Sequence, residues 1–367
     1  MTEHTFEQTR WSLADLLPAV EGPEFDQLLA DLEAAVGELE TSREALSPDI
    51  SEASFLRLVA LVEKIATLSR RLGYYGGLWF YADTQDQDAL AYRGRMEKLL
   101  TDMQNRTLFF DLWWKGLDDG AADRLLAASG DNAYYLASLR DFKPYTLTEA
   151  EEKVINLKDV NGVEALLTVY EMVTTDFSFK VEIDGEVKEL TRDALMVYAR
   201  DPRPEVRAAI YQELYRVFGE QSTVLGQIYQ HIARDWASEN VALRSFSSPI
   251  SVRNLRNDIP DPVADTLLEV CRENAGLFQR WFRLKAGWLG LDKLRRYDIY
   301  APLSSSEKTY PFSEAAAMVL DCLKGFAPEL ADHALRVFAD GHLDSEVRPG
   351  KSGGAFCSGP LPGLTPW

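Results

Sequence analysis

Histidine spacing decides which metal chemistry this sequence can carry out. The chain has four histidines, which are His4, His231, His333 and His342. The nearest two are nine residues apart, so no pair lies four residues apart on one helical face. The zinc motif HExxH needs that spacing, because two imidazoles must reach one ion while the glutamate activates a water molecule. The motif is absent, and we predict no catalytic and no metal-binding residues in this chain.

Four polar side chains alternate along the C-terminal part of the chain: Asp340, His342, Asp344 and Glu346. On one face of a strand they could hold a metal ion, but a polar edge strand facing water explains the same pattern. We favour the edge strand. His231 lies between Ile228 and Ile232 in a helical pattern, and we interpret it as a packed or surface histidine.

Other kinds of catalytic site are not expected either. We predict neither a serine nucleophile on a GxSxG elbow nor a nucleotide-binding loop, and the GxGxxG fingerprint is absent. A basic cluster of Arg200, Arg203 and Arg207 lies beside Asp201 and Glu205, where a helix should begin. We interpret this cluster as a solvated face of salt bridges, which contributes little to stability.

The charge balance argues against nucleic acid as a partner, and the cysteines indicate the redox setting. The 58 acidic and 39 basic side chains leave a net charge of −19, which repels the phosphate backbone of nucleic acids. Cys271, Cys322 and Cys357 are odd in number and not in metal-type spacing, which is typical of reduced thiols. The residues at the start of the sequence have neither the basic nor the apolar character of a leader, so we expect none, and no apolar stretch is long enough for a bilayer. We predict a soluble cytoplasmic protein that binds neither nucleic acid nor membrane.

Helical periodicity dominates the sequence and predicts the elements that must position any site. Apolar residues repeat at three- and four-residue steps over Phe25–Leu39, Phe55–Leu72 and Ala89–Phe110. Three such helices in a row must bury their stripes against one another, as an elongated helical bundle. A further long helix begins at Pro262, with an apolar stripe that continues to Leu284. The fold class is therefore mainly α.

Two local sequence patterns mark the start of one helix and a break between helices. Thr148 and Glu151 have the spacing of a capping box, which predicts a helix start. The run Phe177–Ile183 alternates with a period of two, Asp184-Gly185 follows it, and Val187–Leu190 returns. That pattern predicts one small β-hairpin with a tight turn.

Several segments line up, in order, with one family: WSLADLL at Trp11–Leu17, RAAIY at Arg207–Tyr211, KAGWLGL at Lys285–Leu291, YDIYAPL at Tyr297–Leu303 and LDSEVRPGKSGGAFC at Leu343–Cys357. Together they make the chain resemble the oligoendopeptidase F family of zinc metallopeptidases, which is similar to thimet oligopeptidase. The resemblance covers essentially the whole chain. Each motif is short, so the order and the spacing of the motifs carry the match.

The resemblance implies a domain division and a function. Residues 1–190 correspond to an N-terminal helical region that ends in the β-hairpin. Residues 191–367 correspond to an incomplete N-terminal part of a zincin-like catalytic domain. The implied activity is zinc-dependent hydrolysis of short peptides. The family places its HExxH helix after the GAFC stretch, so we expect this chain to be cut off before the zinc motif, to bind no zinc and to be inactive.

One element of the implied site lies within the chain. By resemblance, Gly353, Gly354, Ala355 and Phe356 form an edge strand that pairs with the backbone of a substrate peptide. An ordinary glycine-rich loop is the alternative for these residues. For the whole chain, the alternative function is a non-catalytic helical protein that binds a peptide or another partner. We also expect residues 353–367 to be poorly packed, since their apolar side chains would lack partners in a truncated enzyme.

Overall fold

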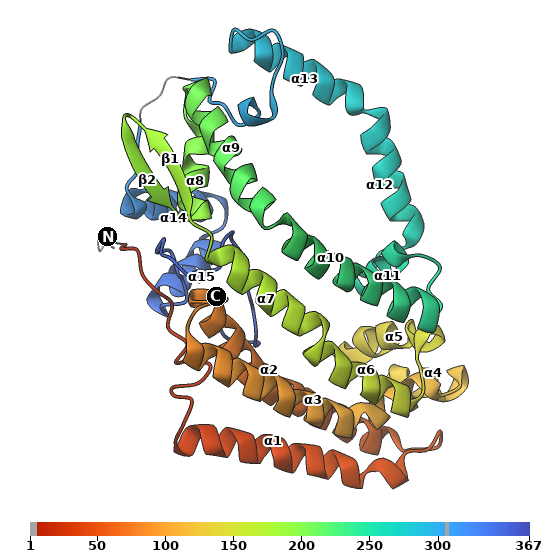
Figure 1. The fold of residues 1–367 in the computed structure, drawn as a ribbon. Coiled ribbons are helices and arrows are strands. Elements are labelled where there is room, and N and C mark those ends of the chain that lie inside the picture. The colour runs from red at the N-terminus through yellow and green to blue at the C-terminus, as the bar shows by residue number, and fades with distance from the viewer. Residues whose placement is uncertain (1–5, 305–307) are drawn as a thin grey trace.

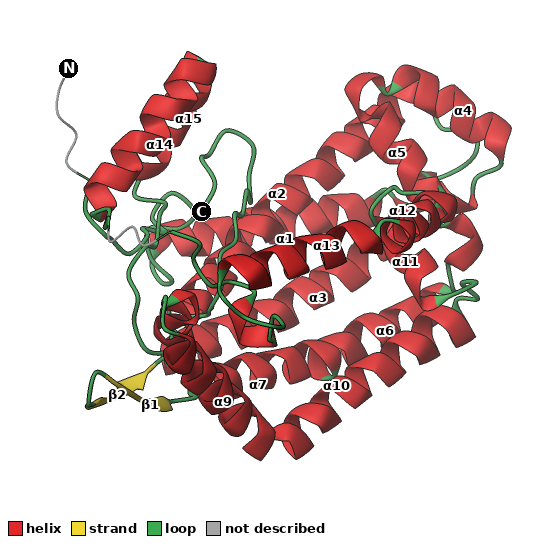
Figure 2. Cartoon of the chain, turned by 90° about the horizontal axis from the view of Figure 1, so that it is seen from above, coloured by secondary structure: helices red, strands yellow, loops and turns green. Residues whose placement is uncertain are grey.

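The computed structural model describes residues 6–304 and 308–367, so His4 lies outside the described residues. Helices make up nearly all of the regular structure, and one hairpin contains the only strands within these two ranges (Figure 2). The prediction of a mainly α fold is confirmed. No helix in the described part of the chain has both the length and the apolar character of a membrane span.

The first three long helices form the bundle that their apolar stripes predict (Figure 1). They are α1 (Pro23–Thr41), α2 (Glu52–Ala82) and α3 (Gln87–Gly116). The side chains of Ser51 and Asp86 cap α2 and α3, because each accepts hydrogen bonds from N–H groups that the first helical turn leaves free. Phe55 is fully buried in the bundle core and stacks on Trp114 at 5.1 Å.

Four shorter helices extend this bundle: α4 (Asp119–Ala128), α5 (Ala133–Arg140), α6 (Glu149–Asn161) and α7 (Val163–Thr175). The predicted capping box opens α6. The Thr148 N–H donates to Glu151 Oε2 at 2.9 Å, and the Glu151 N–H donates to Thr148 Oγ1 at 3.4 Å. Asn156 Nδ2 donates to Asn105 Oδ1 at 2.8 Å and joins α6 to α3.

The predicted hairpin is also confirmed, with β1 at Phe179–Ile183 and β2 at Glu186–Leu190. Its turn residues, Asp184 and Gly185, have φ values of 55° and 78°. Both lie in the left-handed region that a two-residue hairpin turn of this kind requires. β1 alternates buried and exposed side chains, and Phe179 packs with Ile210 in a second core beside α9.

The chain then continues through a row of helices: α8 (Arg192–Val197), α9 (Pro204–Glu220), α10 (Ser222–Trp236), the π-helix η5 (Ala237–Leu243) and α11 (Pro249–Arg256). Arg244 fastens the end of η5 to the bundle. It donates to both carboxylate oxygens of Glu152, at 2.7 and 2.8 Å. Close by, the rings of Tyr145 and Phe246 stack at 3.6 Å.

The prediction of one long helix from Pro262 to Leu284 is wrong. The segment is two helices, α12 (Asp261–Glu273) and α13 (Ala275–Trp288), which form an arch in Figure 1. They meet at Asn274, whose side-chain amide and backbone N–H both bond to the Val270 carbonyl. The apolar stripe is exposed rather than buried, since no described element packs on it; Leu267, for example, is 62% exposed.

The last two helices, α14 (Phe312–Phe326) and α15 (Pro328–Ala339), pack against each other. After α15 the chain runs without helix or strand from residue 340 to residue 367. This segment returns to the N-terminal part of the molecule. Trp367 Nε1 donates to the Ser12 carbonyl at 2.8 Å, and the Ser12 N–H donates to the Gly341 carbonyl at 2.7 Å.

Candidate substrate-binding site

The predicted substrate residues lie in a segment whose main chain the fold does not use. Gly353, Gly354, Ala355, Phe356 and Cys357 are all exposed. None of their backbone N–H and C=O groups makes a backbone hydrogen bond with another described residue. Backbone donors and acceptors are obligatory hydrogen-bonding groups, so those without a partner among the described residues are available to water or to a ligand. The segment therefore offers the polar groups that an extended peptide needs.

The residues just before this segment are fixed to the C-terminal end of α2. The Ser352 N–H donates to the Tyr81 carbonyl at 3.0 Å. Arg348 Nη2 donates to the Ala82 carbonyl at 2.8 Å. The last carbonyls of a helix have no partner within the helix, so the loop satisfies acceptors that α2 leaves free. The free segment consequently begins from a rigid support.

A buried carboxylate holds this loop in shape. The side chain of Asp344 is fully buried; it accepts from Arg348 at 2.8 and 2.6 Å and from Lys351 Nζ at 2.8 Å. Lys351 Nζ also donates to the carbonyls of Asp344 and Glu346, both at 2.9 Å. Burial alone would raise the pKa of Asp344, but the bonds from Arg348 and Lys351 outweigh it and keep that pKa below its ordinary value. Asp344, Arg348 and Lys351 thus form one charged cluster centred on Asp344, which we call the charged lock.

Two glycines allow the loop to approach its neighbours closely. Gly350 has a φ of 78°, and a Cβ there would lie 2.4 Å from Asp83 Oδ1. The Gly350 carbonyl accepts from both the N–H and the hydroxyl of Thr84, at 2.8 and 3.0 Å. A Cβ on Gly353 would lie 3.1 Å from Asp193 Oδ1. A larger residue at either position would displace the segment.

A cavity of about 420 Å³ adjoins the free segment, between α7, the start of α8 and the loop. Gly353 and Gly354 form part of its wall. Glu171, Asp193 and Glu346 also line it, and Glu171 Oε2 accepts from the Ser352 hydroxyl at 3.2 Å. The size of the cavity suits a small ligand or one side chain of a peptide.

The edge strand expected at residues 353–356 is not formed, because no described strand lies beside these residues to pair with them. They run as an irregular, exposed segment. The stretch Gly350–Gly354 does match the GxSxG pattern, which sequence reasoning missed. It joins no strand to a helix, and the Ser352 hydroxyl bonds to Glu171 rather than to a described histidine. The context of a nucleophile elbow is therefore missing.

The expectation that residues 353–367 are poorly packed is wrong for its second half. Ser358 and Trp367 exchange two backbone hydrogen bonds, at 2.7 and 2.8 Å. Trp367 is only 5% exposed, and Leu361 and Leu364 pack with it against α2. The N-terminal segment and α2 supply the apolar partners that the sequence did not reveal. Only Phe356 remains half exposed, with its ring beside those of Trp11 and Tyr81.

The alternating residues 340–346 do not form the polar edge strand that we favoured, and they do not converge on one point. His342 is buried, stacks on Trp367 at 3.6 Å, and places Nδ1 2.6 Å from Thr365 Oγ1. The Thr365 hydroxyl donates in turn to Asp340 Oδ2 at 2.8 Å. Asp344 points instead into the charged lock described above. His231 is exposed, as one of our two interpretations had it.

The basic cluster at Arg200, Arg203 and Arg207 is only partly a solvated face. The side chain of Arg203 is 42% exposed and pairs with Asp201. Arg207 is 2% exposed and donates to the fully buried Asp298 at 2.8 Å. The interpretation of Arg207 as a surface residue was wrong, because the motif that pairs with it lies 91 positions away in the sequence.

Arg207 links the motifs that carried the resemblance. It also donates to the Tyr297 carbonyl at 3.2 Å, while Lys285 Nζ donates to the Ile299 carbonyl at 2.7 Å. Burial lowers the pKa of Lys285, and the positive charge of Arg207 lowers it further. The motifs at 207–211, 285–291 and 297–303 thus meet in one buried polar cluster. Their role in this structure is to hold α9 and α13 together.

Zinc does not fit the donors available in the described ranges. The single group of three close metal-type side chains found there is Asp159, Asp235 and Glu239, whose ligand atoms lie within 4.8 Å of one another. All three are carboxylates, whereas zinc sites in proteins rely on histidine or cysteine ligands. Burial, followed by the charges of Glu239 and Asp235, raises the pKa of Asp159 to about 6. Glu239 is already paired with Arg244 at 2.7 Å.

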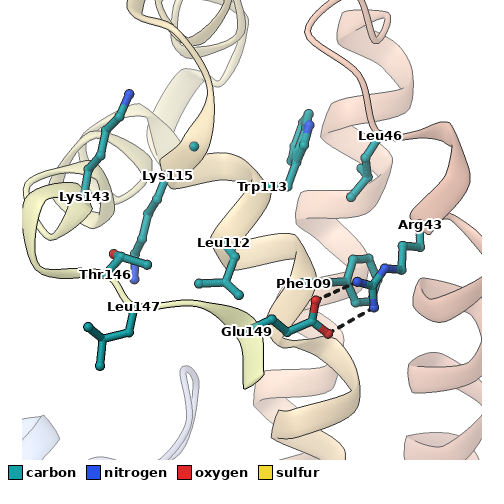
Figure 3. A pocket seen from close by; sticks show the side chains of 11 residues that line it. Arg43, Leu46, Phe109, Leu112, Trp113, Lys115, Lys143, Thr146, Leu147 and Glu149 are labelled. Carbon is teal, nitrogen blue, oxygen red and sulfur yellow. Dashed lines mark hydrogen bonds and ion pairs between the residues drawn. The ribbon is translucent and has the colours of Figure 1, made fainter. Parts of the chain in front are cut away.

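A larger cavity of about 580 Å³ lies far from the free segment, between η1 (Arg43–Ala45), α3 and the start of α6 (Figure 3). Arg43 and Glu149 close one side with a two-bonded ion pair at 3.1 and 2.6 Å. Lys115 pairs with Asp111, and Lys143 donates to the Leu117 carbonyl. All charged side chains that line it are therefore engaged, and we do not consider it the functional site.

Sequence reasoning found the segment itself but not its surroundings. Glu171 and Asp193 reach the site from α7 and α8, and no local motif marks either residue. Asp344 appeared only as one member of an alternating run. Its spacing to Arg348, four residues, could have indicated a salt bridge.

Comparison with known proteins places this geometry in context. A sequence model of peptidase family M3 matches residues 197–364. Group B oligopeptidase PepB of Streptococcus agalactiae is 26% identical over 228 residues, which cover 59% of this chain and 36% of that protein. Oligopeptidase PepF of Bacillus subtilis is 22% identical over 371 residues, covering 95% of this chain and 52% of that protein.

Solved structures share the fold. Oligoendopeptidase F from Enterococcus faecium aligns with a TM-score of 0.70 at 19% identity, over 87% of this chain and 66% of that one. The chain thus spans about a third to a half of the length of the two curated relatives named above. These findings confirm the resemblance to oligoendopeptidase F that the motifs indicated.

Proposed function

We propose that this chain forms the peptide-binding portion of an oligopeptidase, and that residues 353–357 bind short peptides in an extended conformation. The observation that carries the proposal is the unused main chain of these five exposed residues. Relatives named as oligopeptidases and oligoendopeptidases supply the class of ligand.

Main-chain pairing explains how one site can accept many short sequences. Peptide N–H and C=O groups are the same in every substrate, so hydrogen bonds to them give affinity without strict sequence preference. Gly353 and Gly354 carry no side chain that would keep the ligand backbone away. The lock around Asp344 holds the segment on α2, so little ordering is needed when a ligand binds. The adjoining cavity would receive one ligand side chain.

We further propose that this chain alone neither holds zinc nor hydrolyses peptides. In the complete enzyme, by resemblance, zinc would polarise the scissile carbonyl and activate water. The histidines here lack the required spacing, and the one carboxylate cluster described above suits zinc poorly. Residues 1–190 would then act as a helical wall and residues 191–367 as the first part of the peptidase domain. The three exposed free cysteines agree with a reducing, cytoplasmic setting.

Binding of backbone-modified peptides tests the proposed segment. We expect a short peptide to bind more tightly, in calorimetric titration, than the same peptide with its central amides N-methylated, because N-methylation removes the donors that the segment would accept. Gly353→Val should abolish binding, since its Cβ would crowd Asp193. Gly359→Ala is the matched control, because nothing lies within 4 Å of a Cβ there. Equal binding of both peptides, or unchanged binding to Gly353→Val, contradicts the proposal.

Metal analysis and a turnover assay test the second part. After dialysis the chain should hold no stoichiometric zinc and should leave a quenched fluorescent peptide intact. Chelator-sensitive cleavage, or one tightly held zinc per chain, would refute this part while leaving peptide binding to be judged by titration. The non-catalytic alternative, a helical protein that binds a peptide or another partner, predicts the same absence of turnover, so the binding titrations and not the turnover assay bear on it.

A further inference from the structure

A second, mainly apolar cleft lies on the helical bundle, away from the peptide segment. It has a volume of about 500 Å³ and lies between α2, α3 and α5. Its floor is made of core side chains: Val59, Ile65, Phe110 and Leu136 are each no more than 8% exposed. Ligand sites are typically clefts of this size with apolar walls and a few polar groups.

The polar groups of the cleft gather near Arg70. Arg70 lines the cleft and makes no hydrogen bond or ion pair with any described residue. Tyr135 lines the same cleft, and its hydroxyl can donate a hydrogen bond. Asp111 is already paired with Lys115 at 2.7 Å. One arginine without a described partner and one hydroxyl donor thus line the same cleft.

The other end of the cleft reaches Val59, eleven residues before Arg70 on α2. At 1.5 Å per residue this is about 16 Å along the helix. Glu63 also lines the cleft, and its carboxylate has no partner among the described residues. It lies seven residues, or about two helical turns, before Arg70. Arg70 is the single cation among the described lining residues, beside the carboxylates of Glu63 and Asp111, so an anionic head group would be attracted to Arg70.

The helical walls favour a hydrocarbon chain over a peptide as the occupant. α2, α3 and α5 are regular helices, so their peptide groups bond within each helix and offer no main-chain partners. Thr67 and Thr107 also line the cleft, but their hydroxyls donate to carbonyls of their own helices. A peptide backbone would lose its hydrogen bonds to water without replacement, whereas a hydrocarbon chain would not.

We propose that this cleft binds an unbranched apolar carboxylate, such as a medium-chain fatty acid, with the carboxylate at Arg70 and the hydrocarbon chain along α2 toward Val59. Arg70 supplies the charge complement, and the Tyr135 hydroxyl donates to the same carboxylate. Leu361 and Pro362 cover part of the cleft. Binding therefore also contacts the C-terminal segment that follows the peptide-binding residues.

Calorimetric titration with dodecanoate against the full chain tests this site. Each methylene removed should weaken binding about fourfold, from ~0.8 kcal/mol for each buried methylene. Methyl dodecanoate should bind at least tenfold more weakly than dodecanoate, because it lacks the charge. Dodecylamine should also bind weakly. Preferential binding of the amine would indicate unspecific attraction to an acidic protein and would overturn the assignment.

Variants locate the binding. Arg70→Gln should weaken dodecanoate binding at least tenfold, whereas Arg57→Gln, an exposed arginine on the same helix but outside the cleft, should not change it. Ala66→Trp should block the cleft without disturbing the fold, because Ala66 is exposed on α2. Hydrogen exchange at residues 361–362 should slow when dodecanoate binds. Unchanged affinity in both Arg70→Gln and Ala66→Trp would overturn the proposal.

Discussion

Replacing Arg207 by methionine should destabilise the protein strongly, because this side chain is a buried hub. Arg207→Met keeps a similar length but removes the charge opposite Asp298. It also removes the donor to the Asp201, Pro202 and Tyr297 carbonyls, whose distances to the guanidinium are 2.7, 2.8 and 3.2 Å.

The magnitude follows from what is left behind. Removing one partner of a buried ion pair costs about 3–5 kcal/mol. Asp298 keeps a second partner, Arg295, at 2.6 Å, which reduces the penalty of an uncompensated charge. The three carbonyls that lose their donor act in the opposite direction and increase the loss. Because the two corrections oppose each other, we expect a loss of about 3–5 kcal/mol in the free energy of unfolding.

Urea denaturation followed by circular dichroism measures this loss. The matched control is Arg203→Met, on the residue that precedes α9, where the arginine side chain is 42% exposed and pairs with Asp201 and Asp184. A solvated pair of this kind should contribute less than about 1 kcal/mol. If Arg207→Met and Arg203→Met shift the urea midpoint equally, the assignment of Arg207 as a buried hub is wrong.

Two further predictions concern the loop that carries the peptide segment. Gly350→Ala should lower stability by about 1–3 kcal/mol, because the residue has a φ of 78° and its Cβ would clash with Asp83, whereas Gly359→Ala should change stability little in the same urea assay. The lowered pKa of Asp344 adds stability that is present above its ordinary pKa of about 3.9 and is lost as pH falls through the folded-state value. Asp344→Asn should therefore flatten the loss of stability below about pH 4; an unchanged acid profile would contradict the lock.

The sequence predicted most of the helices because their apolar stripes are local. The periodic runs at Phe25–Leu39, Phe55–Leu72 and Ala89–Phe110 fall within α1, α2 and α3. The hairpin was predictable for the same reason, since Asp184-Gly185 sets the turn through its own backbone preference. The apolar stripe from Pro262 to Leu284 predicted helix but not the exposure of that face, because periodicity indicates an amphipathic face and does not say whether anything packs on it.

The parts that could not be predicted depend on contacts between distant segments. The sequence alone indicates a surface position for Arg207, because its burial depends on the ion pair with Asp298. The burial of Trp367 depends on His342 and on the N-terminal segment around Ser12. Gly353–Phe356 could be proposed from the motif alone, but the cavity beside them needs Glu171 and Asp193 from other helices. Such pairings have no signature in one sequence, because nothing in the local pattern records the partner.

Hydrogen exchange of residues 353–357, with and without a short peptide, tests the central claim most directly. In the free protein these five amides should exchange fast, since they donate to no backbone acceptor among the described residues. Ser358 and Trp367, which bond to each other, should exchange more slowly. A saturating short peptide should slow exchange at Gly354 to Phe356, and the N-methylated peptide should not. Unchanged exchange at these residues when the peptide is bound, with protection appearing elsewhere, would contradict the account.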